Sequence, residues 1–301
     1  MTAAAPDRAI TAIVLRLGAA FVFAAMGAMI KLAEAGGAHL AEILFFRQTF
    51  ALLPVTLWIA AGPGLGTLRT QRFGAHVLRT AMGLTSMCFV FITILLLPLA
   101  ESTTMQFTLP IFATILGAVV LREPTGVHRW GAVVAGFFGV LIITQPGSVS
   151  HMPLIGVATG LTGALLSASV SILLRQIGRT EGAATTVFWF SALSVPVLVT
   201  PFALFATPHP ASTWLWLALV GVFGGCAQLL MTASLRFGAV SLVVPMDYTG
   251  LVWATMFGWV VFNALPTSAT LLGAPILIGS GLYIVWREHR LQRMKAAQAI
   301  A

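Results

Sequence analysis

The feature that most constrains this chain is a succession of apolar stretches, each long enough to cross a lipid bilayer. A spanning helix needs about 20 mostly apolar residues, because each residue rises about 1.5 Å through a core about 30 Å thick. The stretches are uniformly apolar and not alternating, which favours helices over barrel strands. The sequence therefore predicts an all-α integral membrane protein with ten transmembrane helices, at residues 10–32, 41–61, 76–97, 101–121, 128–145, 154–175, 184–205, 213–235, 240–262 and 268–287.

Composition excludes a soluble fold. Of the 301 residues, 58% are hydrophobic and only 8% are charged, whereas a soluble domain carries roughly 25% charged residues. The longest connection, residues 62–75, is too short for a soluble domain. Cys88 and Cys226 both fall inside predicted helices and have neither metal-site nor disulfide spacing. We therefore expect the lipid bilayer as a partner, and no metal or cofactor.

The net charge of +8 is ordered by side, with Lys31 as the main exception. Basic residues cluster in alternate connections and at the C-terminus, namely Arg69, Arg72, Arg122, Arg129, Arg175, Arg179, Arg236, Arg287, Arg290, Arg293 and Lys295. Cytoplasmic loops of membrane proteins carry such an excess of Lys and Arg. The pattern predicts a multi-pass protein of the bacterial inner membrane with both termini in the cytoplasm, and it explains the charge without a nucleic-acid partner.

An internal repeat relates residues 105–121 to residues 246–262. Seven of the seventeen positions are identical: Met105, Thr108, Ala113, Thr114, Gly117, Val119 and Val120 recur as Met246, Thr249, Ala254, Thr255, Gly258, Val260 and Val261. The fourth predicted helix thus matches the ninth, which divides the chain into halves at residues 1–150 and 151–301. Because five spans per half is an odd number, the two repeats are inverted in the membrane. Inverted repeats are typical of secondary transporters, with the substrate site near the midplane between them.

With this layout, the chain resembles the drug/metabolite transporter superfamily, specifically its EamA-type members with ten helices. The resemblance rests on Lys31, on Arg47, and on the segments Leu121-Arg122-Glu123-Pro124 and Pro245-Met246-Asp247-Tyr248-Thr249. One departure is Asn263-Ala264-Leu265-Pro266, where the family often has an acid before the proline. The resemblance implies a secondary transporter that works by alternating access and is most similar to amino-acid and metabolite exporters, including aromatic amino acid exporters. It leaves two alternatives open, namely uptake of a nucleoside-like metabolite such as S-adenosylmethionine and export of toxic organic cations.

Asp247 is the foremost candidate for transport because a charge inside a spanning helix is costly. It shares a helix face with Gly250, Ala254 and Gly258, and Pro245 just before it predicts a kink. We expect Asp247 either to take a coupling proton or bind a substrate amine, or to pair structurally with an arginine. Its repeat counterpart is Gln106, followed by a second predicted kink at Pro110, and we expect these two helices to meet across the pseudo-two-fold axis.

Further candidates for the substrate cavity are aromatic, charged or amide side chains inside the predicted helices. Aromatic rings can hold apolar or cationic groups, although ordinary helix packing explains any one of them. Arg47 either pairs with Glu42 or Glu101 as a gate or binds a carboxylate, and the alternative is a fixed structural pair. His76 and Arg79 could help to admit anionic groups. The full set is Phe107, Trp189, Tyr248, Trp253, Arg47, Glu101, His76, Arg79 and Gln228.

Other function classes find little support in the sequence. There is no phosphate-binding loop with the pattern G-x-x-x-x-G-K-[ST], so an ion or substrate gradient must supply the energy. An intramembrane enzyme would need a cluster of nucleophile, base or metal-binding groups, and a channel would need a polar stripe. Gly156-x-x-x-Gly160 and Gly221-x-x-x-Gly225 allow close helix packing within one chain or in a dimer. We expect a monomer or a weak homodimer.

Overall fold

Helices account for nearly all of the chain that the computed structural model describes, which comprises residues 6–62, 64–120, 126–145, 153–178, 180–237 and 243–298. The predicted boundary near residue 150, the start of the predicted helix at 240 and the segment 121–124 lie outside these residues. The α-helices are α1 (Pro6–Ala35), α2 (Leu40–Ala61), α3 (Phe73–Leu96), α4 (Leu99–Gln106), α5 (Leu109–Val119), α6 (Val127–Thr144), α7 (Leu154–Ile177), α8 (Ala183–Phe205), α9 (Ala211–Phe237), α11 (Thr249–Phe262) and α12 (Ser268–Gln298). Two short 3₁₀ helices are η1 (Leu65–Leu68) and η2 (Val244–Tyr248).

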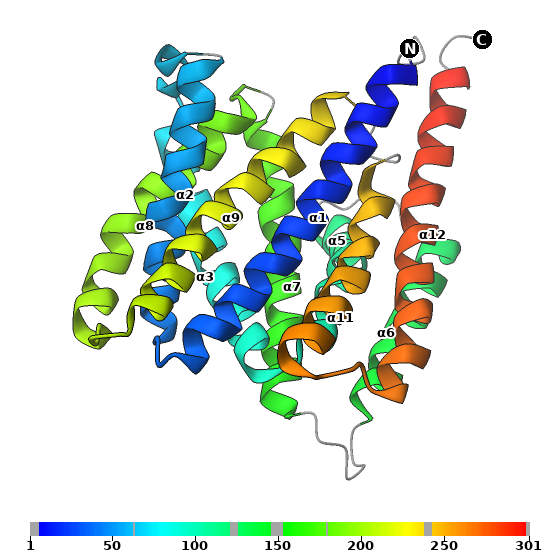
Figure 1. Cartoon of the computed structure of the whole chain (residues 1–301). Helices are drawn as coiled ribbons and strands as arrows, with labels where there is room; N and C mark the ends of the chain where they lie inside the picture. The colour runs from blue at the N-terminus through cyan, green and yellow to red at the C-terminus, as the bar shows by residue number, and fades with distance from the viewer. Residues whose placement is uncertain are drawn as a thin grey trace.

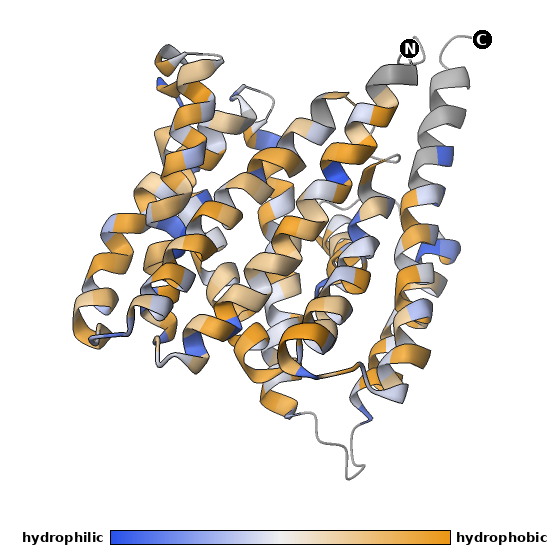
Figure 2. Cartoon of the chain, in the orientation of Figure 1, coloured by the Kyte–Doolittle hydropathy of each residue, from blue (hydrophilic) through white to orange (hydrophobic). Residues whose placement is uncertain are grey.

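Nine stretches of the described residues are long and apolar enough to cross a membrane, with α4 and α5 counted together as one span. The tenth predicted span is η2 followed by α11, whose α-helical part has only 14 residues. Apolar residues run along the helices, and hydrophilic residues are sparse within them (Figure 2). The structure therefore confirms the predicted all-α membrane fold. Because α1 begins and α12 ends on the same side (Figure 1), we call this side the terminal face and the opposite side the far face.

The fourth helix of each repeat is interrupted. Phe107 and Thr108 separate α4 from α5, and Pro110 lies in the first turn of α5, where a missing backbone N–H costs nothing. In the second repeat, Pro245 lies in the first turn of η2, and α11 follows directly. Both predicted proline sites thus coincide with a break in the α-helix, and the breaks fall at equivalent positions of the two repeats.

The two repeats are interlocked. Helix α1 packs along α9, and its counterpart α7 packs along α3, while α2 contacts α8 and α6 contacts α12. The broken helices meet through α4 and α11, as predicted, and α11 buries only Gly250, Ala254 and Gly258. Most helix contacts therefore join one repeat to the other, so the interface between repeats forms the interior of the protein.

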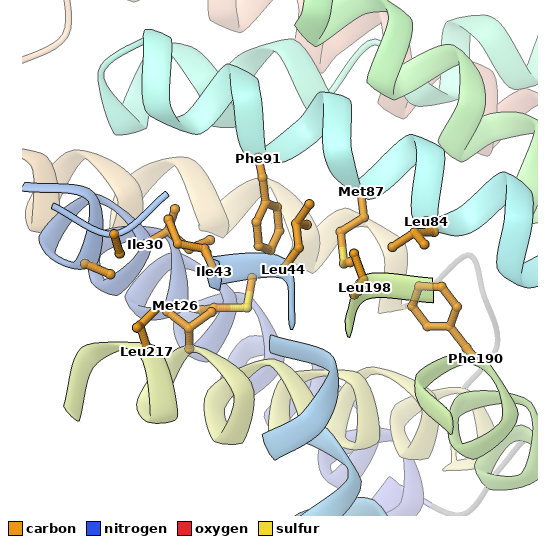
Figure 3. Close-up of a cluster of buried hydrophobic side chains, with 13 residues drawn as sticks. Met26, Ile30, Ile43, Leu44, Leu84, Met87, Phe91, Phe190, Leu198 and Leu217 are labelled. Atoms are coloured by element: carbon orange, nitrogen blue, oxygen red, sulfur yellow. The ribbon is translucent and has the colours of Figure 1, made fainter. Parts of the chain in front are cut away.

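The largest buried hydrophobic cluster lies in this interface, and Figure 3 shows its side chains. It unites Met26, Leu44, Met87, Phe190 and Leu217, which come from five different helices. Glycines allow the helices around it to approach closely. A Cβ on Gly225 of α9 would lie 2.9 Å from the carbonyl oxygen of Ala51 in α2, and a Cβ on Gly160 of α7 would lie 2.8 Å from the Cβ of Met105. The small-residue motifs therefore act within the chain.

Candidate functional site

Two equivalent residues of the repeats meet in the protein interior. Helices α2 and α8 are the second helices of the two repeats, and Arg47 and Gln48 of α2 correspond to within one residue to Phe190 and Ser191 of α8. The Ser191 hydroxyl donates a hydrogen bond to Gln48 Oε1 at 3.3 Å, and both side chains are fully buried. Equivalent residues approach one another only near a two-fold axis. The Gln48–Ser191 contact therefore marks the axis and the centre of the repeat interface.

Two arginines converge on this centre. Arg47 Nη1 donates to Gln48 Oε1 at 2.7 Å. Arg79 of α3 places its guanidinium carbon 3.9 Å from the centre of the Phe190 ring, a cation–π contact. The two arginines are joined through neighbouring residues, because Arg47 bonds Gln48, Gln48 accepts from Ser191, and Arg79 lies on the ring of Phe190. Each arginine is only 6% exposed. A Cβ on Gly224 would lie 3.0 Å from Arg47 Nε, so this glycine makes room for the guanidinium.

The structure corrects the predicted partners of Arg47, which contacts neither Glu42 nor Glu101 within the described residues. Glu42 lies in the first turn of α2, at the far face, and contacts His209 there. Glu101 accepts hydrogen bonds from the Thr267 backbone N–H at 3.0 Å and from the Thr270 hydroxyl at 3.2 Å. It thereby caps the start of α12, where a carboxylate is favoured by the helix dipole. Each carboxylate lies in the first turn of a helix and neither pairs with Arg47 among the described residues, where Glu101 Oε2 is buried without a hydrogen-bond partner.

The breaks in the fourth helices form a second contact between equivalent residues. The rings of Phe107 and Tyr248 lie edge to face with centroids 4.9 Å apart. The Tyr248 hydroxyl and Gln106 Nε2 are buried and have no hydrogen-bond partner among the described residues. The Tyr248 hydroxyl lies over Gly281 of α12, where a Cβ would collide with it. This region therefore holds two polar atoms free to bind a ligand.

Asp247 pairs with an arginine. Arg16 of α1 donates from Nε to Oδ1 and from Nη2 to Oδ2 of Asp247, a bidentate ion pair. The Arg16 side chain is 8% exposed and that of Asp247 is 41% exposed. This geometry matches the structural alternative stated for Asp247, and it also leaves the carboxylate within reach of solvent and protons.

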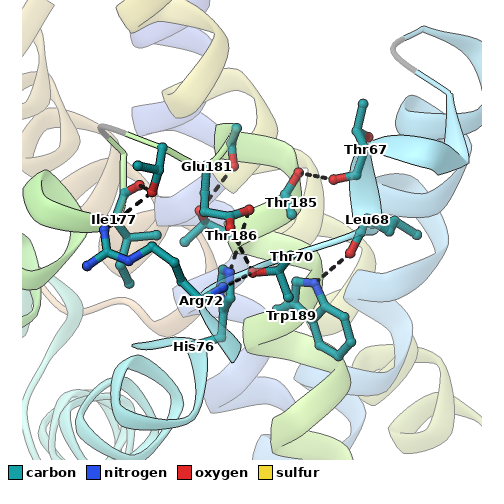
Figure 4. Close-up of polar contacts among 12 residues, drawn as sticks. Thr67, Leu68, Thr70, Arg72, His76, Ile177, Glu181, Thr185, Thr186 and Trp189 are labelled. Carbon is teal, nitrogen blue, oxygen red and sulfur yellow. Dashed lines mark hydrogen bonds and ion pairs between the residues drawn. The ribbon is translucent and has the colours of Figure 1, made fainter. Parts of the chain in front are cut away.

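A group of hydrogen bonds closes the terminal face between the repeats (Figure 4). We call this group the terminal latch; it joins Thr67, Leu68, Thr70, Arg72 and His76 to Gln176, Thr180, Glu181, Thr185 and Trp189. The Thr185 hydroxyl donates to the Thr67 carbonyl at 2.9 Å, and the Thr70 hydroxyl donates to Glu181 at 2.7 Å. His76 is fully buried, with Nε2 3.9 Å from Glu181.

An equivalent group closes the far face. We call it the far latch; it comprises Glu42, Thr207 and His209. Glu42 Oε1 lies 2.8 Å from His209 Nε2 and accepts from the Thr207 backbone N–H at 3.3 Å. Glu42 and Thr185 are each the third residue of their helix, and each reaches the loop after the second helix of the other repeat. The two latches are therefore pseudo-symmetric counterparts on opposite faces.

The predicted aromatic candidates do not form one ring around a cavity. Only Phe107 and Tyr248 come together. Trp189 donates from its indole N–H to the Leu68 carbonyl at 3.0 Å in the terminal latch. Trp253 packs on Phe21 of α1, with centroids 5.1 Å apart. Trp189 belongs to α8 and contacts the loop after α2, whereas Trp253 belongs to α11 and contacts the middle of α1. Helical spacing along one sequence does not show which helices pack together.

The remaining candidates lie apart from these contacts. Gln228 is half-buried in α9, one turn beyond Gly224. A cavity of about 300 Å³ opens near the far face beside Lys31, lined also by Leu96, Leu97, Pro98, Leu99, Gly258, Phe262 and Ala264. This cavity sits where α1, the start of α4 and the end of α11 meet.

Sequence reasoning missed Phe190, Ser191, Glu181 and His209. A signal for the first two was present: Phe46 and Pro54 of the second helix recur at the same spacing as Phe188 and Pro196, which places Phe190 and Ser191 opposite Gln48 and Thr49. The other two lie in or beside loops, where the repeat carries no similarity.

Comparisons with known proteins agree with this architecture. A model described as the EamA-like transporter family matches the chain twice, over residues 10–145 and 154–287. A riboflavin transporter of Vibrio cholerae is 29% identical over 234 residues, which cover 75% of this chain and 76% of the relative. A pseudopaline exporter of Pseudomonas aeruginosa is 28% identical over 271 residues, covering 88% and 93%. An S-adenosylmethionine uptake transporter of Rickettsia conorii is 28% identical over 268 residues, covering 85% and 86%.

A solved structure shares the fold. Its TM-score is 0.62 at 18% identity, and the match covers 93% of this chain and 98% of the other. At this identity the likeness concerns the fold alone.

Proposed function

The chain belongs to the EamA-like transporter family, and from this premise we propose that it exports amino acids or similar amphiphilic metabolites across a bacterial inner membrane by alternating access. The observation that carries the mechanism is the pair of equivalent latches on opposite faces. An inverted repeat allows one face to adopt the conformation of the other, so the two latches can open in turn around a site fixed at the axis.

Substrate would bind where the repeats meet, next to Gln48 and Ser191. Opening the terminal latch exposes this centre to one compartment while the far latch stays closed, and the reverse step releases the substrate. The basic residues on the terminal face, including Arg69 and Arg72, support a cytoplasmic location for that face. The bidentate Arg16–Asp247 pair is a candidate for proton coupling, because protonation of the half-exposed carboxylate would release Arg16.

The direction and the substrate class follow from the resemblance to exporters stated above. Uptake is the second candidate, because one of the relatives named above is an S-adenosylmethionine uptake transporter. The test is transport of labelled amino acids in liposomes that contain the purified protein in a known orientation. Saturable export would support the proposal. Transport of a riboflavin-like or nucleoside-like solute with no amino-acid transport would replace the proposed substrate and retain the carrier.

A further inference from the structure

The most unusual feature of the interior is a pair of buried arginines that have no acidic partner among the residues the structure describes. Arg47 Nε and both Arg79 Nε and Arg79 Nη1 are buried and have no hydrogen-bond partner among the described residues. An unpaired buried charge is costly, and proteins retain one where a ligand completes it. Arg16, which has Asp247, is the contrasting case in the same bundle.

In the described part of the chain, the groups that surround the pair are hydrogen-bond donors and an aromatic ring. Gln48 Nε2 is buried without a partner in the described part of the chain, and the Ser191 hydroxyl lies beside it. His76 lies one turn before Arg79 on α3. Glu181, in the terminal latch, is engaged by Thr70 and His76. The Phe190 ring covers one face of the Arg79 guanidinium. The centre is thus a set of donors against an aromatic wall.

We propose that Arg47 and Arg79 together bind an oxyanion of the transported solute, a carboxylate or a phosphate, at the pseudo-two-fold axis. This inference rests on the proposed transport function and specifies the cargo. Guanidinium groups bind carboxylate and phosphate through paired N–H donors, which suits both groups equally. The buried amide of Gln48 supplies a further donor. The anion reaches the site from the terminal face along Arg72 and His76, which precede Arg79 on the same side.

The position of the pair explains how binding would couple the two faces. Arg47 belongs to α2, whose start carries Glu42 of the far latch. Arg79 belongs to α3, whose first turn carries His76 of the terminal latch. An anion held by both arginines therefore bridges the helices that reach the two latches. Without the anion, like charges oppose each other at the centre.

The direct test is binding of simple anions to the purified full-length protein in a neutral detergent. Thermal unfolding would be followed while sodium phosphate or sodium benzoate is titrated against sodium chloride of equal ionic strength. We expect saturable stabilisation by at least one of the two probes, and each probe reports one of the two oxyanion chemistries. Arg47→Gln and Arg79→Gln should each weaken this binding by about tenfold or more, since each removes charge-assisted hydrogen bonds.

The control is Arg290→Gln, which removes the same charge from an exposed position on α12 beside Trp286 and should leave anion binding unchanged. A second readout separates a ligand site from a structural pair. Without anion, Arg79→Gln should lower the unfolding temperature by no more than Phe190→Leu does, because both variants remove the cation–π contact while Arg79→Gln also removes an uncompensated charge. A drop clearly larger than that of Phe190→Leu would indicate an acid partner within the chain and would overturn the proposal.

A transport assay completes the test, because it distinguishes failure of the oxyanion site from failure of the proposed transport function. In an assay of the counterflow of labelled amino acids, unlabelled L-phenylalanine should compete with the label and inhibit its uptake. L-phenylalaninamide, which lacks the carboxylate, should not inhibit. Counterflow that both compounds inhibit equally would leave the carrier standing and overturn the oxyanion site. Stabilisation by phosphatidylglycerol with no effect of either free anion would assign the arginines to a lipid and would also overturn it.

Discussion

Phe107 and Tyr248 occupy equivalent positions of the two repeats and pack edge to face with ring centroids 4.9 Å apart. Each lies at the break in the fourth helix of its repeat. Their contact closes the repeat interface on the side of α12, as the Gln48–Ser191 contact does on the side of α8. The rings stabilise the interface by packing, while the Tyr248 hydroxyl has no partner among the described residues.

Substitutions at Tyr248 should separate these two roles. Tyr248→Phe keeps the ring contact and should leave thermal stability unchanged, whereas Tyr248→Ala should cost about 2 kcal/mol or more through the cavity that it leaves. If the hydroxyl binds substrate, Tyr248→Phe raises the KM of transport at unchanged stability. Thermal unfolding and initial transport rates measure the two effects, and a loss of stability in Tyr248→Phe would show that its hydroxyl is in fact bonded.

The Arg16–Asp247 pair should behave as one unit. We expect Arg16→Gln and Asp247→Asn each to lower stability, and the double variant to lower it by less than their sum. The coupling energy should be about 1 kcal/mol, because the Asp247 side chain is 41% exposed and solvent weakens the attraction. A double-mutant cycle of unfolding free energies measures it. Full additivity would contradict the bidentate pair, and unchanged pH dependence of transport in Asp247→Asn would remove its proposed coupling role.

The two latches should be separable by substitution. Glu42→Gln weakens the contact with His209 and should raise the population that is open at the far face, while Glu181→Gln should do the same at the terminal face. Spin labels on exposed residues beside each latch, in a background without Cys88 and Cys226, would report the distances across both faces. Opening of both faces by either single variant would contradict a mechanism in which the latches alternate.

Close packing of α9 on α2 predicts a strong effect of one added methyl group. Gly225→Ala should destabilise the protein by about 1–3 kcal/mol, because the new Cβ would lie 2.6 Å from Pro54 Cγ and 2.9 Å from the Ala51 carbonyl oxygen. Gly279→Ala in α12 is the matched control, since no atom lies within 4 Å of its added Cβ. Equal unfolding temperatures for the two variants would show that α2 and α9 pack less tightly than described.

The sequence was sufficient for the architecture because hydrophobic length and the repeat are properties of contiguous segments. Pro110 and Pro245 likewise located the helix breaks, since proline acts on its own backbone. Ion-pair partners were harder to predict from the sequence, because the residues of a pair can be far apart in the chain, as Arg16 and Asp247 are with a separation of 231 residues. Of the alternatives stated for Arg47, the pairing with Glu42 or Glu101 is not formed among the described residues, because Glu42 bonds His209 and Glu101 bonds Thr267 and Thr270, which only tertiary packing reveals.

The most direct test of the account is counterflow of labelled amino acids into liposomes that hold the purified protein and an excess of unlabelled solute. A carrier that alternates between two faces predicts transient, saturable accumulation of label, absent from empty liposomes and reduced by the Arg47→Gln variant. Uptake that does not saturate and shows no overshoot would indicate a channel and would contradict alternating access between two latched faces.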